Sequence, residues 1–434
     1  METRARSRRR RLEEEEEEGG AVDHIGRLPD AVLGEIISLL PTKDGARTQA
    51  FSRRWRPLWR AAPLNLDGDH LPGCSVDDVA RILAAHPGPG RRFSVHTGYL
   101  KRCASDRRAE ILDGFLRSPA LDNLQELEAH YHYGGAAVPP PPPVSVRRFA
   151  STLRLASFGS CSFPDHGGDD AGGALQLPLL KHLSLLNAVI TEKSLYGLLA
   201  GCPGLQSLLL FENRGLSRVR IVSSSLRSSG VNLAGCDLEL IVEDAPCLER
   251  CLCSTGPSRL ELGATVFQGL RLVNLGVVVQ SIKVLSLLQD NLSLDVVINF
   301  MKCFPCLENL YIKTHRVGEK NVWCHKYRDV IGSLDFRLKK IVLTNYRGNS
   351  SHVNFAKFFL LNARVLESMR LELESGNPNS EWIERQHRVL RIKNKASRGA
   401  QFEGVIPHLA VERTQSEPLS CFEIRASLSP PVQK

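Results

Sequence analysis

The sequence predicts an α/β protein in which a small all-α module of three helices is followed by a curved solenoid of leucine-rich repeats, closed by an α/β cap. Three observations predict this class: helical spacing of apolar residues in 28–61, a recurring L-x-x-L-x-L phrase, and a strand–turn–helix–strand order in 331–402. The predicted parts are a disordered charged tail (1–20), the helical module (21–66), irregular repeats (67–330), the cap (331–402) and a disordered tail (403–434).

Composition places the chain among globular proteins. Of its 434 residues, 42% are hydrophobic and 24% are charged, and a net charge of +9 is spread along the chain. No apolar run approaches the ~18 residues of a membrane span, and we see no secretory signal. The twelve cysteines are therefore expected to be reduced thiols in a protein of the nucleus, the cytoplasm or both.

The first twenty residues contain an arginine cluster, 8–11, followed by six consecutive glutamates, 13–18. Such charge blocks are solvated and favour disorder. The basic half is interpreted either as a nuclear-import signal or as part of a low-complexity tail.

The helical module begins with one apolar stripe. Its members fall at i, i+3, i+4 and i+7, and they are Leu33, Ile36, Ile37 and Leu40. Pro29 suits a helix start, and Pro41 ends this helix. Thr42 and Ser52 are predicted caps of the second and third helices. Gly45 is expected to weaken the second helix by about 1 kcal/mol relative to Ala, and Pro57 to kink or shorten the third.

Three short helices in about 45 residues cannot bury much core. Leu28, Pro29, Ile36 and the tryptophans Trp55 and Trp59 are therefore expected to be exposed and to contact a partner. The alternative is a helical hairpin that packs on the rest of the chain.

Residues 23–66 resemble an F-box, the module that binds a Skp-family adaptor of a cullin-based ubiquitin ligase. The resemblance rests on Leu28-Pro-Asp30, the apolar run 36–40, Pro41-Thr-Lys-Asp44, and Ser52-Arg-Arg-Trp55 followed by Leu58-Trp59. It implies the following adaptor-binding or supporting residues: Leu28, Pro29, Ile36, Leu40, Trp55 and Trp59.

The repeats are clearest at Leu180-Lys-His-Leu-Ser-Leu185 and, 25 residues later, Leu205-Gln-Ser-Leu-Leu-Leu210. Helical spacing at 195–199 and the stop Gly201-Cys-Pro203 lie between them, which is the leucine-rich-repeat period. Similar phrases begin at Leu124, Leu153, Leu307, Leu338 and Leu366. Residues 211–235 and 254–280 match poorly, so distorted or incomplete units are expected there. The alternative is a compact α/β domain with coincidental leucines.

Residues 331–402 resemble the FBD domain that follows leucine-rich repeats in many plant F-box proteins. The predicted order is a strand at 338–343, a turn at 345–348, a helix at 353–361 and a strand at 368–373. Such a unit could close the open end of a repeat array.

The remaining motifs favour structural interpretations. The five prolines 139–143 predict a stiff spacer rather than an SH3-like ligand, and residues 165–174 predict an exposed loop. Cys303 and Cys306 have zinc-ligand spacing, but Cys324-His325 are adjacent, so core packing is preferred. The basic stretch 385–398 is interpreted as solvated surface rather than as a nucleic-acid site.

The sequence shows no catalytic motif, so no catalytic residue, cofactor or metal is predicted. The resemblances imply a non-catalytic, substrate-recognition subunit of an SCF-type ubiquitin ligase. Its partners would be the Skp-family adaptor, cullin through that adaptor, and an unknown target protein, without nucleic acid or membrane. Two alternatives are a non-ligase interaction scaffold and a small-ligand receptor of the F-box/LRR type.

Overall fold

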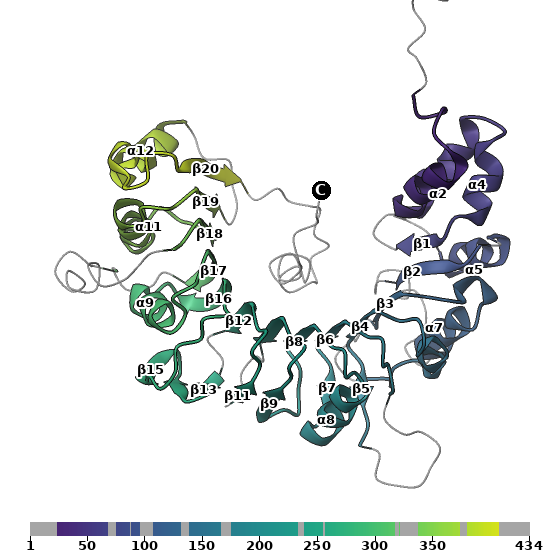
Figure 1. Ribbon diagram of the computed structural model, residues 1–434, viewed down its shortest axis with the longest axis horizontal. Coiled ribbons are helices and arrows are strands. Elements are labelled where there is room, and N and C mark those ends of the chain that lie inside the picture. The colour runs from purple at the N-terminus through teal and green to yellow at the C-terminus, as the bar shows by residue number, and fades with distance from the viewer. Residues whose placement is uncertain are drawn as a thin grey trace, which may run out of the picture. The chain divides into compact units, whose positions relative to one another are not determined.

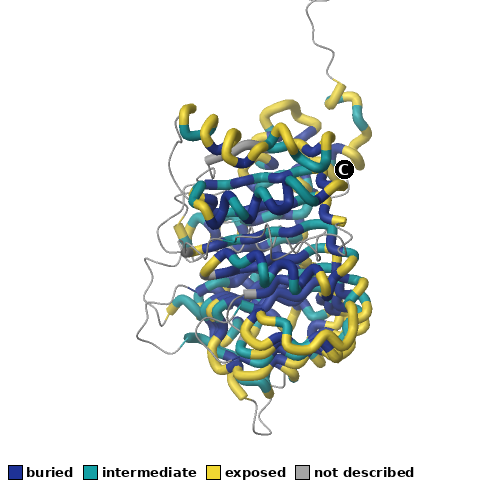
Figure 2. The backbone as a smooth tube through the Cα atoms, turned by 90° about the vertical axis from the view of Figure 1, so that its left-hand side faces the viewer, coloured by how far each residue is buried: buried dark blue, intermediate teal, exposed yellow. Residues whose placement is uncertain are grey.

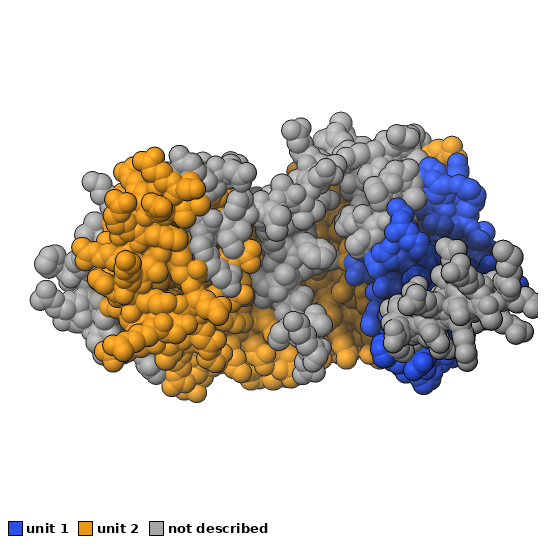
Figure 3. Space-filling view, turned by 90° about the horizontal axis from the view of Figure 1, so that it is seen from above, with its two compact units in different colours: residues 1–94, 118–124 blue, residues 95–117, 125–434 orange. Residues whose placement is uncertain are grey.

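The computed structural model describes residues 24–67, 75–86, 88–95, 107–131, 139–165, 175–232, 238–254, 257–316, 321, 337–373 and 380–407. These residues form two compact units, which Figure 3 shows in different colours. Unit 1 comprises residues 1–94 and 118–124, and unit 2 comprises 95–117 and 125–434. The predicted tail 1–20, the loop 166–174 and the tail beyond residue 407 lie outside the described residues.

Unit 1 has a helix at each of the three predicted places. These are α2 (Asp30–Leu39), α3 (Thr42–Arg47), extended by the 3-10 turn η1 (Thr48–Ala50), and α4 (Trp55–Ala61). The unit continues with β1 (Leu64–Asp67), α5 (Val76–Ala85), β2 (Gly90–Val95) and η4 (Pro119–Leu121), and β1 pairs with β2 in parallel. As the stripe predicts, Leu33 and Ile37 of α2 are buried.

The predicted caps of the second and third helices are wrong. Thr42 lies inside α3, and its hydroxyl donates to the carbonyl of Asn65 in β1. Helix α4 begins at Trp55 with Arg54 as the flanking residue, so Ser52 lies outside it. Pro57 then falls in the first turn, where a backbone N–H has no intrahelical acceptor, and no kink is required.

Unit 2 is built on a ladder of parallel strands. In spatial order they are β3 (Glu126–His130), β4 (Leu155–Gly159), β6 (His182–Leu186), β8 (Ser207–Phe211), β10 (Ser228–Asn232), β12 (Arg250–Ser254), β16 (Val284–Asn291), β17 (Asn309–Arg316), β18 (Lys340–Thr344), β19 (Ser368–Leu373) and β20 (Gln401–Pro407). Each predicted leucine phrase forms one strand. The register aligns Leu183 with Leu208 and Leu185 with Leu210, so equivalent leucines stack across the repeats.

Helices cover one side of this ladder. They are α7 (Arg108–Leu116), α8 (Glu192–Ala200), α9 (Leu294–Cys303), α11 (Ser350–Asn362) and α12 (Ser380–Leu390) (Figure 1). The prolines 139–143 lead directly into η5 (Val144–Phe149), and the short strands β5 (Ser162–Phe163) and β7 (Val189–Ile190) pair in parallel. Figure 2 shows the buried residues concentrated along the strands.

A second sheet replaces the helices in the middle of unit 2. Its strands are β9 (Arg218–Val222), β11 (Leu238–Asp244), β13 (Pro257–Leu262), β14 (Thr265–Gln268) and β15 (Arg271–Asn274), and the last two are antiparallel. Irregular units were expected in 211–235 and 254–280, and the residues described there do depart from the strand–helix repeat, because strands stand in place of helices. Strand β9 alternates exposed and buried residues, a signal of period two that the sequence contains.

Side chains of α8 close one edge of this second sheet. The Glu192 carboxylate accepts a hydrogen bond from the backbone N–H of Arg218 at 2.8 Å, and the Tyr196 hydroxyl accepts one from that of Arg220 at 3.2 Å. These are groups of the edge strand β9 that would otherwise be open to another strand.

Buried asparagines connect consecutive repeats of unit 2. Asn213 Oδ1 accepts from the backbone N–H of Ala188 at 2.9 Å, and its amide donates to the carbonyl of Leu185 at 3.1 Å. Asn345 donates in the same way to Thr314, at 2.8 Å. These bonds satisfy backbone groups where each strand ends, which a buried turn requires.

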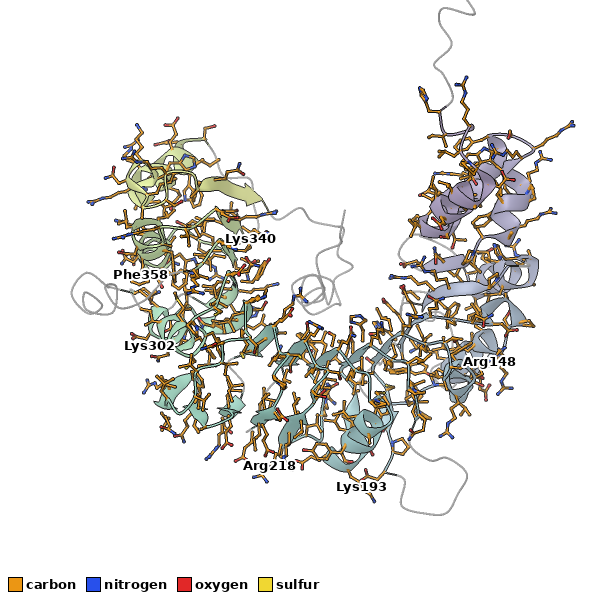
Figure 4. All side chains as sticks on the ribbon, in the orientation of Figure 1. Arg148, Lys193, Arg218, Lys302, Lys340 and Phe358 are labelled. Carbon is orange, nitrogen blue, oxygen red and sulfur yellow. The ribbon has the colours of Figure 1, made fainter. Side chains whose placement is uncertain are left out.

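The C-terminal part of unit 2 has the predicted order of strand, turn, helix and strand, formed by β18, α11 and β19. Gly348 in the turn has φ +66°, and a side chain there would meet Gln386 and Trp382 of α12. Buried Phe355, Phe358 and Phe359 fix α11 against the strands, and Figure 4 labels Phe358.

Leu210→Ala should destabilise unit 2 by about 2–5 kcal/mol, because the fully buried side chain leaves a cavity in the stacked column. Urea unfolding of the full chain measures the loss. The matched control is Leu179→Ala, whose side chain is 48% exposed and whose loss should be below about 1 kcal/mol. Equal losses for the two variants would contradict this packing.

His352 should make the fold sensitive to acid. Burial, with the nearby Arg347 charge, lowers its pKa from 6.5 to about 4. Between these values the unfolded chain binds the proton more strongly, so stability falls as the pH drops from about 6.5 towards 4. In His352→Gln the urea midpoint should change less between pH 7.5 and 5 than in the parent chain. His387→Gln, on the exposed face of α12, should behave like the parent.

Candidate functional site

Helix α2 carries two apolar stripes, and only one of them is buried in unit 1. Leu33 and Ile37 pack inside, whereas Val32, Ile36 and Leu39 are 39%, 37% and 71% exposed. The exposed residues are spaced i, i+4 and i+7, so they share one face of the helix. An apolar stripe that faces water on a short helix is typical of a surface that another protein covers.

Two more large apolar side chains of unit 1 face solvent. Phe51, between η1 and α4, is 70% exposed, and Ile25, before α2, is 57% exposed. Phe51 lies edge-on to Trp55, with ring centroids 5.3 Å apart, so its exposed ring rests on a buried one. Exposed aromatic rings with a fixed orientation are effective anchors in protein–protein interfaces.

The two tryptophans are buried, which corrects the expectation that they are exposed to a partner. Only 5% of Trp55 and 9% of Trp59 is exposed. The Trp59 ring lies over Gly45 and is 5.1 Å, centroid to centroid, from the ring of His86, which it meets edge-on. These rings form the core that holds α2, α3 and α4 together, so they support the exposed stripe from beneath.

The other predicted adaptor-binding residues lie nearer the surface. Pro29 and Ile36 are exposed, and Leu28 and Leu40 are half-buried at the two ends of α2. The structure thus places four of the six predicted residues where a partner could reach them. Whether they bind an adaptor stays a prediction.

Arg54 has a role that sequence reasoning missed. Its guanidinium donates to Asp30 Oδ1 at 2.6 Å, to the carbonyl of Leu28 at 2.5 Å and to the carbonyl of Gly26. These bonds fix the segment that enters α2, including Leu28 and Pro29. Nothing in the local pattern around Arg54 indicates acceptors more than twenty positions away.

Strand β1 holds the other end of α2. The side-chain amide of Asn65 donates to the backbone carbonyl of Ser38, and the backbone carbonyl of Asn65 accepts a hydrogen bond from the Thr42 hydroxyl. Between α2 and α4 runs an open groove of about 370 Å³, whose lining includes Gly34, Ser38 and Leu58. The exposed stripe therefore stands on a helix that is fixed at both ends.

The concave face of the strands in unit 2 is a second candidate surface. Figure 4 shows Lys340 on this side and Lys193, Arg218 and Lys302 on the outer side. The Lys340 ammonium lies 5.8 Å from the Tyr311 ring centroid, within reach of a cation–π contact.

The described residues offer no support for a metal site or a membrane span. Among them, no group of three or more His, Cys, Asp and Glu side chains could hold a metal ion, and no helix is long and apolar enough to cross a bilayer. Burial raises the pKa of Cys303 to about 11, which disfavours the thiolate that zinc requires. Cys324 and His325 lie outside the described residues.

Comparison with known proteins identifies the repeats. A family model for the LRR repeats of FBD-associated F-box protein At5g56370 matches residues 112–258 and 251–312, and the FBD model matches 326–371. The F-box/FBD/LRR-repeat protein At2g04230 of Arabidopsis thaliana is 28% identical over 230 residues, 47% of this chain and 46% of the relative.

Two further Arabidopsis thaliana relatives are similar over shorter stretches. F-box/LRR-repeat protein At5g02910 is 28% identical over 192 residues, 44% of this chain and 38% of the relative. The putative F-box protein At1g49610 is 43% identical over 65 residues, 15% of this chain and 17% of the relative. The chain thus spans less than half the length of each of these relatives.

A parallel-strand ladder with stacked leucines and an FBD match at its C-terminal part defines a leucine-rich-repeat protein of mixed α/β structure. The chain belongs to the plant F-box/LRR proteins that carry an FBD domain, which confirms the resemblance found in its sequence.

Gly45→Ala should destabilise unit 1 by about 1–3 kcal/mol, because a Cβ there would overlap Cζ3 of Trp59 and lie 3.0 Å from Cε3. Gly34→Ala is the matched control, since a Cβ at that helical position meets nothing within 4 Å, and it should stabilise by about 1 kcal/mol. Thermal unfolding of the two variants measures both effects. Destabilisation of the same size in both variants would show that Trp59 does not pack on Gly45.

Proposed function

We propose that the chain is the substrate-recognition subunit of an SCF-type ubiquitin ligase. The three helices of residues 30–61 act as its F-box, and the leucine-rich repeats hold a target protein. The FBD region would serve as the terminal unit of the repeat array. This role requires the chain in the nucleus, the cytoplasm or both.

The observation that carries the proposal is the exposed stripe Val32, Ile36 and Leu39, together with exposed Phe51. Each side chain loses solvent contact if a Skp-family adaptor covers it, at about 25 cal/mol per Å² of apolar surface. Trp55, Trp59 and Arg54 fix the backbone beneath it, so little order has to be gained on binding. The family membership supports this partner, because the relatives are F-box proteins by name.

The proposed mechanism is positional. The adaptor connects the chain to cullin, and the repeats keep a lysine of the target close to a ubiquitin-charged conjugating enzyme. The rate gain comes from effective concentration, which replaces a bimolecular encounter with an intramolecular one. It requires no catalytic side chain in this chain.

Ile36→Asp combined with Leu39→Asp should weaken binding to a purified Skp-family adaptor by about a hundredfold or more, because both positions would bring a charge into an apolar interface. Isothermal titration of the full chain measures the affinity. Both side chains lie on the solvent face of α2, so the unfolding midpoint should change little.

The matched control is Val365→Asp, at a position that is 50% exposed in unit 2 and should leave adaptor binding unchanged. Parental affinity in the α2 double variant, with the protein still folded, would rule out this stripe as the docking surface.

A further inference from the structure

The basic stretch 385–398 lies at the surface of unit 2. It contains six Lys and Arg residues and no Asp or Glu. It begins in the second half of α12, the last helix of the row that covers the strands (Figure 1), and continues through η6 (Ile392–Asn394). One of its cations, Lys395, donates to the backbone carbonyl of Ala400. The other five are exposed, and we name them the basic patch: Arg385, Arg388, Arg391, Lys393 and Arg398.

The cations of the basic patch form no ion pair within the described part of the chain. Arginines on the strands of unit 2 do find a carboxylate. Arg218 pairs with Glu239 at 2.7 Å, and Arg227 pairs with Glu249 at 3.0 Å. Cations that lie close together without a carboxylate repel one another, and an anionic partner removes that repulsion.

The helix itself accounts for only part of this charge. Cations in the last turn of a helix interact favourably with the partial negative charge at its C-terminus, which explains Arg388 and Arg391 at the end of α12. The effect falls off within that turn, so it does not explain Lys393 and Arg398, which follow the helix.

An apolar side chain lies among the cations. Val389 is 40% exposed, and it sits one helical turn after Arg385 and directly after Arg388. Surfaces for single-stranded nucleic acid place aromatic rings beside their cations so that bases can stack. The tryptophan of α12, Trp382, instead meets the buried ring of Tyr346 edge-on, with centroids 6.4 Å apart. An aliphatic contact among cations suits an acidic protein segment better than a nucleic acid.

We propose that the basic patch is a docking surface for an acidic protein segment. Asp and Glu side chains of that segment pair with the cations, and an apolar side chain between them covers Val389. Arginine suits this role because its planar guanidinium binds a carboxylate through two parallel hydrogen bonds. The surface belongs to unit 2 alone, so the proposal does not depend on adaptor binding.

Fluorescence anisotropy of the full chain tests this surface, with a labelled twelve-residue peptide of alternating Asp and Leu as the probe. Arg385→Gln, Arg388→Gln and Lys393→Gln combined should weaken binding at least about tenfold, because three of the five cations are removed. The affinity of the parent chain should also fall as the salt concentration rises from about 50 mM to about 200 mM.

The matched control removes the same charge from unit 1. Arg53→Gln, Arg56→Gln and Arg60→Gln combined, at exposed positions in and beside α4, should leave the affinity for the peptide unchanged. Equal losses in the two triple variants would mean that net charge alone attracts the peptide, and this would overturn the proposal. No binding by the parent chain at the lower salt concentration would overturn it as well.

Crosslinking locates the bound peptide. With Val389 replaced by p-benzoylphenylalanine, irradiation should attach the peptide to the chain. The same replacement at Val222, which is 58% exposed on β9, should give no adduct. Adducts of equal yield at both positions would contradict docking at the basic patch. A twelve-nucleotide single-stranded DNA that binds more tightly than the peptide, and is weakened more by the α12 triple variant, would overturn the proposal in favour of nucleic acid. No adaptor is present in these measurements, so their outcome is separate from that of the proposed function.

Discussion

The structure of unit 2 depends on one constraint: a repeat has two apolar faces and can bury neither by itself. Stacking in register solves this, because Leu183, Leu208 and their equivalents form continuous columns through the sheet. The columns accept residues of different size, since Ser229 follows Leu208 and Cys251 follows Ser229 in the same register. Each register position in the array therefore requires a side chain that can be buried, and this side chain need not be a leucine.

The convex side is less constrained, and it changes from helices to strands between α8 and α9. Such a change creates sheet edges, and unpaired edges invite association with other strands. Glu192 and Tyr196 of α8 occupy the backbone donors at the β9 edge. At the other end, the antiparallel hairpin of β14 and β15 ends the sheet before α9. The edges of the second sheet are thus closed by side chains of α8 at one end and by a backbone hairpin at the other.

Local patterns were sufficient to predict the helices of residues 30–61 and the strands at the leucine phrases, because these depend on spacing within a few residues. The second sheet does not follow from the leucine pattern, because β9 alternates buried and exposed residues over only five positions, too few to distinguish a strand from an irregular repeat. The burial of Trp59 could not be predicted, since Gly45 and His86, which enclose it, are distant in sequence. The role of Arg54 could not be predicted for the same reason, because its hydrogen-bond acceptors are also distant in sequence.

The two units differ in the exposure of apolar side chains outside the stacked leucine columns and the tryptophan core. Leu39 and Phe51 of unit 1 stay about 70% exposed, although each would gain about 1.5–3 kcal/mol on full burial. In unit 2, by contrast, Leu186, Leu209, Phe211, Leu252 and Leu288 are buried together in one apolar cluster. A protein that covered Leu39 and Phe51 would therefore meet a surface that is already in place, and it would displace only water.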